Sequence, residues 1–295
     1  MIEHLVLPTC GYRLFDVIGA VYELEKNNFY DINNIKSIYA VSGGSILGAA
    51  LCLKSNMEDI MIYSIDKTWE KEKCFDLNMD NFLDFIDEKG IVGLEVIHSF
   101  LEPFFKLNDL DLSKITLLEF YNHTKIEFNI YATNANTLKS ERFSYKTFPD
   151  LELVKAIYMS SSIPCIFKPL YINNNYYIDG GFHIYYPINE CILEDKCKDE
   201  SVLSIKIENN EGFKMFNIVK GDNAFKFLYK IFLKLHTERI NIDYVKNKYH
   251  LVILHNWTAS SEEVGNIIKD SEMRKSYVEI GRNSAIKWLS KLDKD

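Results

Sequence analysis

The stretch Ile38-Tyr39-Ala40-Val41-Ser42-Gly43-Gly44-Ser45-Ile46-Leu47-Gly48-Ala49-Ala50 decides the fold of this 295-residue chain. Its first residues are apolar and include β-branched and aromatic side chains, which predicts a buried strand. A serine and two glycines interrupt this pattern, and the small apolar residues that follow predict a helix. A strand, a tight turn and a helix in direct succession are typical of an α/β protein with a parallel sheet.

Ser42 occupies the turn of this unit. A serine on a sharp strand-to-helix turn has its Oγ exposed at the edge of the sheet, as in the nucleophile elbow of hydrolases. The N-terminus of the following helix adds free N–H groups and a partial positive charge, which suit an oxyanion. Ala40 and Gly44 are small residues two positions on either side of Ser42, whereas Ser45 has Leu47 at the trailing position. We therefore predict that Ser42 is the nucleophile and that Ser45 belongs to the first helical turn. A strand-to-helix turn that is softened by glycines and has no chemical role explains the same residues.

Segments with the apolar patterns of strands and of helices alternate along the whole chain. The strand-like segments span 4–8, 36–41, 126–133, 175–179, 201–206 and 250–255. The helix-like segments span 14–27, 45–55, 57–72, 93–105, 115–123, 152–161, 213–247 and 260–291. This order predicts a three-layer α/β/α fold with a mostly parallel central sheet. Binding sites of such sheets gather at the carboxyl ends of the strands, where Ser42 is expected.

The sequence shows no sign of a boundary between domains. No linker, repeat or low-complexity stretch divides it, and the charged run 193–200 has the composition of a solvated loop. A chain of this length can bury one large core. We expect a single catalytic domain over 1–295, with the informative motifs within 4–190 and with strands and helices of 191–295 completing or flanking the core.

Composition excludes several classes of function. The chain has 34 Lys and Arg against 42 Asp and Glu, a formal charge of −8, which disfavours a nucleic-acid partner. No apolar stretch approaches the ~18 residues that span a bilayer, and the start of the chain has no leader pattern. The six cysteines lack metal-binding spacing, which predicts free thiols in a reducing compartment and no metal or cofactor. We expect a cytoplasmic protein, either free or peripheral on membranes.

The first of three further segments with chemical potential is the turn inside 7–20. An apolar strand ends there, and Cys10, Gly11, Tyr12 and Arg13 precede an amphipathic helix. Backbone N–H groups of such a turn can form an anion-binding nest. An ordinary strand-to-helix turn explains the same residues.

The second segment, 176–181, is a strand that delivers Asp179 onto two glycines, Gly180 and Gly181. An Asp before two glycines often only forms a turn, but a carboxylate at the end of a buried strand can also serve as the base for a serine on a neighbouring strand. The third segment, 156–169, ends a helix in serines before a proline, which by itself is a helix stop.

Together with the elbow, these segments resemble the patatin-like phospholipase family, in the family's order, over most of residues 4–190. The resemblance implies a catalytic dyad of Ser42 and Asp179, and 132–136 is similar to the family's central-strand motif. The loop 9–14 corresponds to the family's glycine-rich oxyanion loop, although only its Gly11 and Arg13 match. The resemblance implies that the oxyanion-binding residues are Cys10, Gly11, Tyr12 and Arg13. It implies that the residues of the elbow and its support are Ala40, Gly43, Gly44, Gly180 and Gly181.

The resemblance implies a phospholipase A type of activity on carboxylic esters of membrane phospholipids. Asp179 would accept the Ser42 proton, Ser42 would attack the ester carbonyl, and water would clear the acyl-enzyme. N–H groups near Gly11 would hold the oxyanion. Arg13 has three candidate partners: the oxyanion, a lipid phosphate or a structural carboxylate.

Two alternative functions compete with this interpretation. An α/β-hydrolase with a Ser-Asp-His triad needs a late histidine, for which His255 is the obvious candidate and His183 and His250 are poorer ones. The other alternative is an inactive scaffold that binds anionic lipid at the surface around Gly11 and Gly43. The sequence leaves the oligomeric state open.

A lysine-bearing segment at 224–235 suggests where a membrane would be contacted. Lys226, Lys230 and Lys234 recur at helical spacing beside an aromatic-rich apolar stripe. A helix packed on the sheet explains the pattern, but a lysine row also attracts an otherwise acidic protein to anionic lipid. We therefore expect an acyl-lipid substrate and a transient membrane surface as partners.

Overall fold

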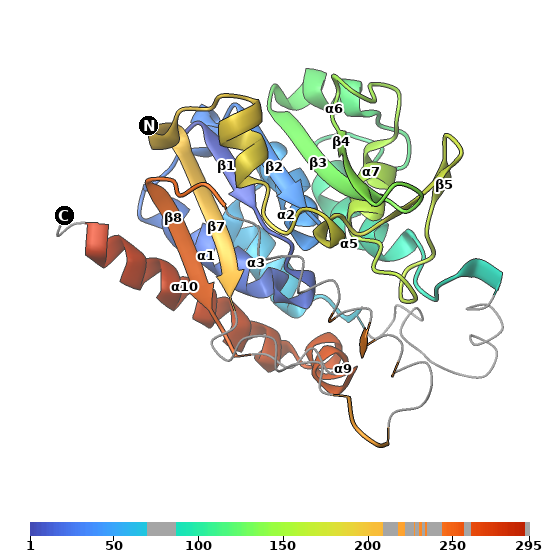
Figure 1. The fold of residues 1–295 in the computed structure, drawn as a ribbon. Coiled ribbons are helices and arrows are strands. Elements are labelled where there is room, and N and C mark those ends of the chain that lie inside the picture. Colours follow the sequence, from blue (N-terminus) through green and yellow to red (C-terminus); the bar gives the residue numbers. More distant parts are fainter. Residues whose placement is uncertain are drawn as a thin grey trace.

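The computed structural model describes residues 1–69, 87–208, 218–221, 227, 230, 231, 234, 244–256 and 261–292. Within these residues a sheet of eight strands forms the centre of the molecule (Figure 1). The strands are β1 (His4–Leu7), β2 (Ser37–Val41), β3 (Glu127–Asn134), β4 (Lys139–Phe143), β5 (Tyr171–Ile172), β6 (Asn175–Ile178), β7 (Val202–Glu208) and β8 (Tyr249–Leu254).

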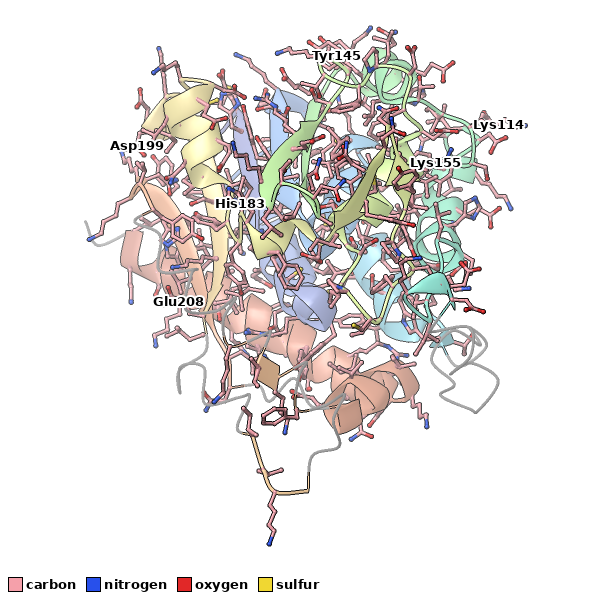
Figure 2. All side chains as sticks on the ribbon, turned by 45° about the vertical axis from the view of Figure 1, so that its right-hand side comes forward. Lys114, Tyr145, Lys155, His183, Asp199 and Glu208 are labelled. Atoms are coloured by element: carbon pink, nitrogen blue, oxygen red, sulfur yellow. The ribbon has the colours of Figure 1, made fainter. Side chains whose placement is uncertain are left out.

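The strand order is β5-β6-β3-β2-β1-β7-β8, with β4 also paired to β3. The five strands β3, β2, β1, β7 and β8 are parallel, whereas β4, β5 and β6 pair antiparallel. Figure 2 labels Asp199, just before β7, and Glu208, its last residue, and so marks the direction of the parallel strands. This mostly parallel central sheet confirms the predicted α/β fold class.

All six predicted strands are present, and two strands escaped prediction. β4 carries the polar sequence Lys139-Ser140-Glu141-Arg142, of which only Lys139 is exposed, so a half-buried strand forms here without the apolar alternation that usually marks one. β5 has only two residues, Tyr171 and Ile172. Hydrogen bonds to a neighbouring strand, rather than local preference, define both elements.

The described helices lie close to their predicted positions. They are α1 (Leu14–Lys26), α2 (Gly43–Cys52), α3 (Met57–Asp66), α5 (Glu95–Lys106), α6 (Leu117–Thr124), α7 (Leu153–Ser160), α9 (Ser261–Lys269) and α10 (Ser271–Leu292). The single helix predicted over 260–291 is wrong, because Asp270 separates α9 from α10. Its N–H donates to the Asn266 carbonyl at 2.8 Å, and its Oδ1 accepts the Glu272 N–H at 2.9 Å, so one residue ends one helix and caps the next.

The helix predicted over 213–247 is also too long. Residues 218–221 and 244–247 are not helical, whereas 227, 230, 231 and 234 are. Lys230 and Lys234 of the lysine row therefore lie on a helical segment, while Lys226 and the apolar partners Phe225, Leu228, Phe232 and Leu235 lie outside the described residues.

The two faces of the sheet are covered differently. Alternate residues such as Leu5, Ile38 and Ile130 face the main core, which the helices build. The intervening residues Val6 and Tyr39 face a smaller core. Segment 184–197, with the π-helical turn at Glu190–Glu194, covers that second face and is the yellow segment over the sheet in Figure 1.

The C-terminal part of the chain shares the core of the N-terminal part. β7 pairs with β1, and α10 packs along α1 (Figure 1). The two helix backbones nearly touch, because a Cβ on Gly19 would lie 2.0 Å from the Val278 carbonyl oxygen and one on Gly281 would lie 1.8 Å from that of Asp16. Glycine is required at both positions. None of the described helices is long and apolar enough to cross a membrane.

Candidate active site

Ser42 stands between the end of β2 and the start of α2, at the carboxyl edge of the sheet. Its backbone has φ 54° and ψ −129°, a conformation that residues other than glycine rarely adopt. A Cβ on Gly43 would lie 2.6 Å from Cys10 Sγ, and one on Gly44 would lie 2.5 Å from the Pro8 carbonyl oxygen. The two glycines after the serine therefore let the β1–α1 loop close over the elbow.

Asp179 reaches the serine because β6 runs antiparallel to β3. Ile178 pairs with Thr133, so the chain after β6 turns back across the end of β3. A Cβ on Gly180 would lie 2.0 Å from the Tyr131 carbonyl oxygen, so only glycine permits this crossing. Ser42 Oγ then donates a hydrogen bond to Asp179 Oδ2 at 2.6 Å, and the Gly181 N–H donates to Oδ1 at 2.7 Å.

The surroundings of Asp179 favour its proton-bound form. The side chain is buried, and its donors, the Ser42 hydroxyl and the Gly181 N–H, are neutral. Desolvation raises the pKa of Asp179 to about 7, against the lowering effect of these two hydrogen bonds. A carboxyl group with this pKa exchanges a proton readily near neutral pH.

The serines at the end of α7 support both members of this pair. The Ser42 N–H donates to Ser160 Oγ at 2.8 Å, and the Ser160 hydroxyl donates to the Tyr131 carbonyl at 2.6 Å. The Asp179 N–H donates to the Ser162 carbonyl at 2.8 Å. From these residues alone we predicted a helix stop, and the segment was also one of those that resemble the family. The signal that was available is the row of polar residues before Pro164 in an otherwise apolar segment, which the structure buries.

The loop over the elbow presents backbone donors to the same place. Residues Gly11–Arg13 form a short 3₁₀ helix, and Gly11 has φ 51°. The loop lies on the first residue of α2, since a Cβ on Gly43 would be 3.4 Å from the Gly11 nitrogen. Within the described residues neither the Gly11 N–H nor the Gly43 N–H donates a hydrogen bond. The two donors flank Ser42 and are able to bind an oxyanion.

Arg13 contacts a carboxylate, the third of its three candidate partners. Its Nε lies 2.7 Å from Asp16 Oδ2, and both side chains are almost fully buried. His255 Nδ1 lies 3.0 Å from the same oxygen. The histidine that a Ser-Asp-His triad would use is therefore bound to Asp16.

The other two candidate histidines have surroundings of their own. His250 Nδ1 hydrogen-bonds to Tyr186 Oη at 2.9 Å, and burial lowers the pKa of its ring. His183, labelled in Figure 2, is exposed. Among the residues that the structure describes, no hydrogen bond joins any of the three histidines to Ser42 or Asp179.

The described residues provide no obvious metal centre. In the part of the chain that the structure covers, no three His, Cys, Asp or Glu side chains gather as they would around an ion. The cysteines at positions 10, 52, 165, 191 and 197 are free thiols. Burial raises the pKa of the Cys10 thiol, which lies beside the elbow, well above its ordinary value.

The fold and the site place the chain among the α/β proteins that carry a serine on a strand-to-helix elbow. Residues 5–192 match the patatin-like phospholipase family, and the chain belongs to this family. The match includes the elbow, the loop before it and the Asp179 segment, the residues on which the predicted resemblance depended.

Two viral proteins are similar to the chain in sequence. The chain is 29% identical over 207 residues to "Probable lipid hydrolase 463L" of Invertebrate iridescent virus 6, covering 68% of each protein. It is 30% identical over 192 residues to "Uncharacterized protein R571" of Acanthamoeba polyphaga mimivirus, covering 63% of this chain and 60% of that protein.

Two solved bacterial structures share the fold. VipD of Legionella pneumophila superposes with a TM-score of 0.53 at 14% identity, over 98% of this chain and 67% of VipD. The type III effector protein ExoU of Pseudomonas aeruginosa superposes with a TM-score of 0.50 at 13% identity, over 98% of this chain and 53% of ExoU. At these identities the likeness concerns the fold alone.

Proposed function

We propose that this protein is a lipid acyl hydrolase of the phospholipase A type, which cleaves carboxylic esters of membrane phospholipids with Ser42 and Asp179. The observation that carries the proposal is the 2.6 Å hydrogen bond from Ser42 Oγ to Asp179 Oδ2 on a strained elbow. Membership of the patatin-like phospholipase family and the viral lipid hydrolase relative support the substrate class.

In the acylation half of the reaction, Asp179 Oδ2 takes the Ser42 hydroxyl proton while Oγ bonds to the ester carbonyl carbon. The carbonyl oxygen becomes an oxyanion, which the N–H groups of Gly11 and Gly43 stabilise. When the tetrahedral intermediate collapses, the bond to the lipid alcohol breaks and Asp179 returns its proton to the leaving oxygen. The products of this half are an acylated Ser42 and a lysophospholipid.

Deacylation repeats these steps with water. Asp179 takes a proton from water, the water oxygen bonds to the acyl carbon, and the same donors hold the oxyanion. Collapse breaks the bond to Ser42 Oγ, Asp179 returns the proton to Oγ, and a fatty acid leaves. One carboxyl group thus acts as base and acid in turn, which a pKa of about 7 suits.

We propose that the protein contacts a membrane surface transiently, because diacyl phospholipids are presented in bilayers. The Lys226, Lys230 and Lys234 row is the proposed contact. Reversing the charge of the three lysines is expected to weaken binding to anionic vesicles several-fold while leaving hydrolysis of a soluble short-chain ester unchanged. If vesicle binding survives, the contact lies elsewhere.

The decisive experiment measures fatty acid release from defined diacyl phospholipids and from neutral lipids, with Ser42→Ala as the control. The proposal predicts release by the natural protein and none by the variant. Vesicle binding without release would favour the lipid-binding scaffold. Complete loss of release in a folded His255→Ala variant, equal to that in Ser42→Ala, would favour the triad.

A further inference from the structure

Three ionisable side chains from distant parts of the chain meet beneath the proposed oxyanion loop. Arg13 ends the 3₁₀ helix of the loop, Asp16 lies in the first turn of α1, and His255 follows β8. Asp16 Oδ2 accepts from Arg13 Nε at 2.7 Å and lies 3.0 Å from His255 Nδ1. Since a carboxylate only accepts, His255 must carry its proton on Nδ1 to bond there.

Burying these groups needs an explanation. Arg13 and Asp16 are 1% and 0% exposed, and His255 is 11% exposed. A buried ion pair stabilises a protein weakly, because desolvation offsets the attraction between the charges. Its main effect is to restrict the positions of the elements that carry the charges. Here those elements are the loop over Ser42, the first turn of α1 and the end of β8.

The C-terminal helices hold the histidine in turn. The His255 ring packs edge-on against Tyr277 of α10, with ring centroids 4.5 Å apart. Tyr277 Oη donates to Glu263 of α9 at 2.5 Å, and the Tyr277 ring lies 6.2 Å from that of Tyr12. His255, Glu263 and Tyr277 all lie beyond position 192, where the family match ends.

The loop carries Gly11, whose N–H is one of the two proposed oxyanion donors. Gly11 is its one glycine between Pro8 and Gly19, and its Cβ position is open space. Oxyanion donors are effective only when they are held in position before the reaction. A side chain at the end of the 3₁₀ helix, bonded to a buried carboxylate, provides that restraint.

We propose that Asp16 and His255 are positioning residues, which hold the Cys10–Arg13 loop against the elbow through Arg13. This inference rests on the proposed function and deepens it, because it assigns a role in the reaction to Asp16 and to His255, the second of which lies outside the family match. Neither residue touches the reacting atoms. Their loss displaces the Gly11 N–H, which serves the transition state more than substrate binding.

The test uses full-length protein and two readouts. The first is the second-order rate at which a fluorophosphonate labels Ser42, a reaction that places an oxygen in the oxyanion site. The second is kcat and KM for a soluble short-chain ester. The variants are Asp16→Asn, His255→Ala and His255→Asn, of which the last keeps an N–H donor near the position of Nδ1.

The chain offers a matched control for lost helix packing. Arg282 Nε of α10 lies 2.9 Å from the carboxylate of Glu23, at the opposite end of α1 from Arg13. Glu23→Gln therefore breaks a mostly buried ion pair between the same two helices without touching the loop. Thermal unfolding of every variant measures how much stability each change costs.

Asp16→Asn and His255→Ala are expected to lower the labelling rate and kcat at least about tenfold with KM nearly unchanged. His255→Asn should recover part of this loss, and Glu23→Gln should keep the natural rates even where its unfolding temperature falls. If folded Asp16→Asn and His255→Ala label Ser42 at the natural rate, or if Glu23→Gln loses rate equally, the positioning role is wrong. If Asp16→Asn does not fold, the two variants His255→Ala and His255→Asn test the positioning role by themselves. Absence of labelling in the natural protein would overturn the proposed function itself, and this inference with it.

Discussion

Asp179 and Asp16 are both buried carboxylates of the same molecule, and their neighbours differ. Asp179 accepts from a hydroxyl and a backbone N–H, both neutral, and its pKa rises to about 7. Asp16 accepts from the guanidinium of Arg13 and lies beside His255, so its charge is compensated by a buried cation. Although both carboxylates are buried, only Asp179 contacts a hydroxyl group, whereas Asp16 contacts two side chains from separate elements and joins those elements.

The largest effect is expected at the group that bonds to Asp179. Ser42→Ala should abolish ester hydrolysis, because no other hydroxyl contacts the Asp179 carboxylate in the described residues. Ser45→Ala is the matched control, since Ser45 Oγ donates to the Ser42 carbonyl at 2.6 Å and so belongs to the helix start. Fluorophosphonate labelling followed by peptide mapping checks both. A label on Ser45 would show that the nucleophile is misassigned.

The next largest effect separates the two carboxylates directly. Asp179→Asn should reduce kcat at least ~10²-fold, the usual scale for losing a general base, whereas Asp16→Asn should cost about tenfold because it only misplaces donors. Steady-state rates with one soluble ester measure both. Equal losses in the two variants would mean that the distinction between base and support is mistaken.

The pH dependence of the natural protein should report Asp179. The base form carries the reaction, so kcat/KM should rise with pH, with a midpoint near the pKa of about 7. One pH unit below the midpoint the rate falls to about a tenth of its plateau. Asp16→Asn should lower the plateau and leave the midpoint in place. A profile that stays flat from pH 5 to 8 would contradict Asp179 as the base.

A smaller effect concerns stability. The pKa of Asp179 is raised in the folded state, so the folded protein binds this proton more tightly than the unfolded chain does. Between the ordinary value near 4 and about 7, the contribution of Asp179 to the unfolding free energy therefore falls as pH rises. Asp179→Asn should unfold a few degrees above the natural protein at pH 8, and the gap should narrow toward pH 4. An opposite trend in thermal unfolding would contradict the raised pKa.

No effect at all is expected from a chelator. Ser42 and Asp179 contact each other directly, and the proposed steps use only these side chains, backbone donors and water. Ester hydrolysis should continue in excess EDTA. Complete loss of activity that calcium restores would show that a metal joins the site.

How far sequence predicted this site depends on how far apart the contacting residues lie. The elbow was predictable because Ser42, Gly43 and Gly44 are adjacent and each has a local reason to be there. The contact of Asp179 with Ser42 was predictable from a strand that ends on two glycines together with the resemblance to the family. The contact of Ser160 was not predictable, because Ser160 is 118 positions from Ser42 in the sequence. Only the packing of α7 in the fold brings its hydroxyl to the Ser42 N–H.

The same limit applies to the support of the loop and to the fold. Arg13 and Asp16 are three positions apart, but His255 joins them from 239 positions beyond Asp16, and its place after a strand suggested a catalytic histidine instead. The core strands followed from apolar runs. β4 depends on its pairing with β3, and the break at Asp270 depends on a helix cap. A hydrophobic pattern indicates neither of these.

The strained backbone of Ser42 also bears on natural selection. A residue other than glycine at φ 54° and ψ −129° costs on the order of 1–3 kcal/mol. Glycine adopts this conformation without that cost, and a single substitution to glycine would relieve it. In a protein that only bound lipid, such a change would be neutral or beneficial. The proposed role of the Ser42 hydroxyl as nucleophile gives a reason for a serine at this position in spite of its cost to folding.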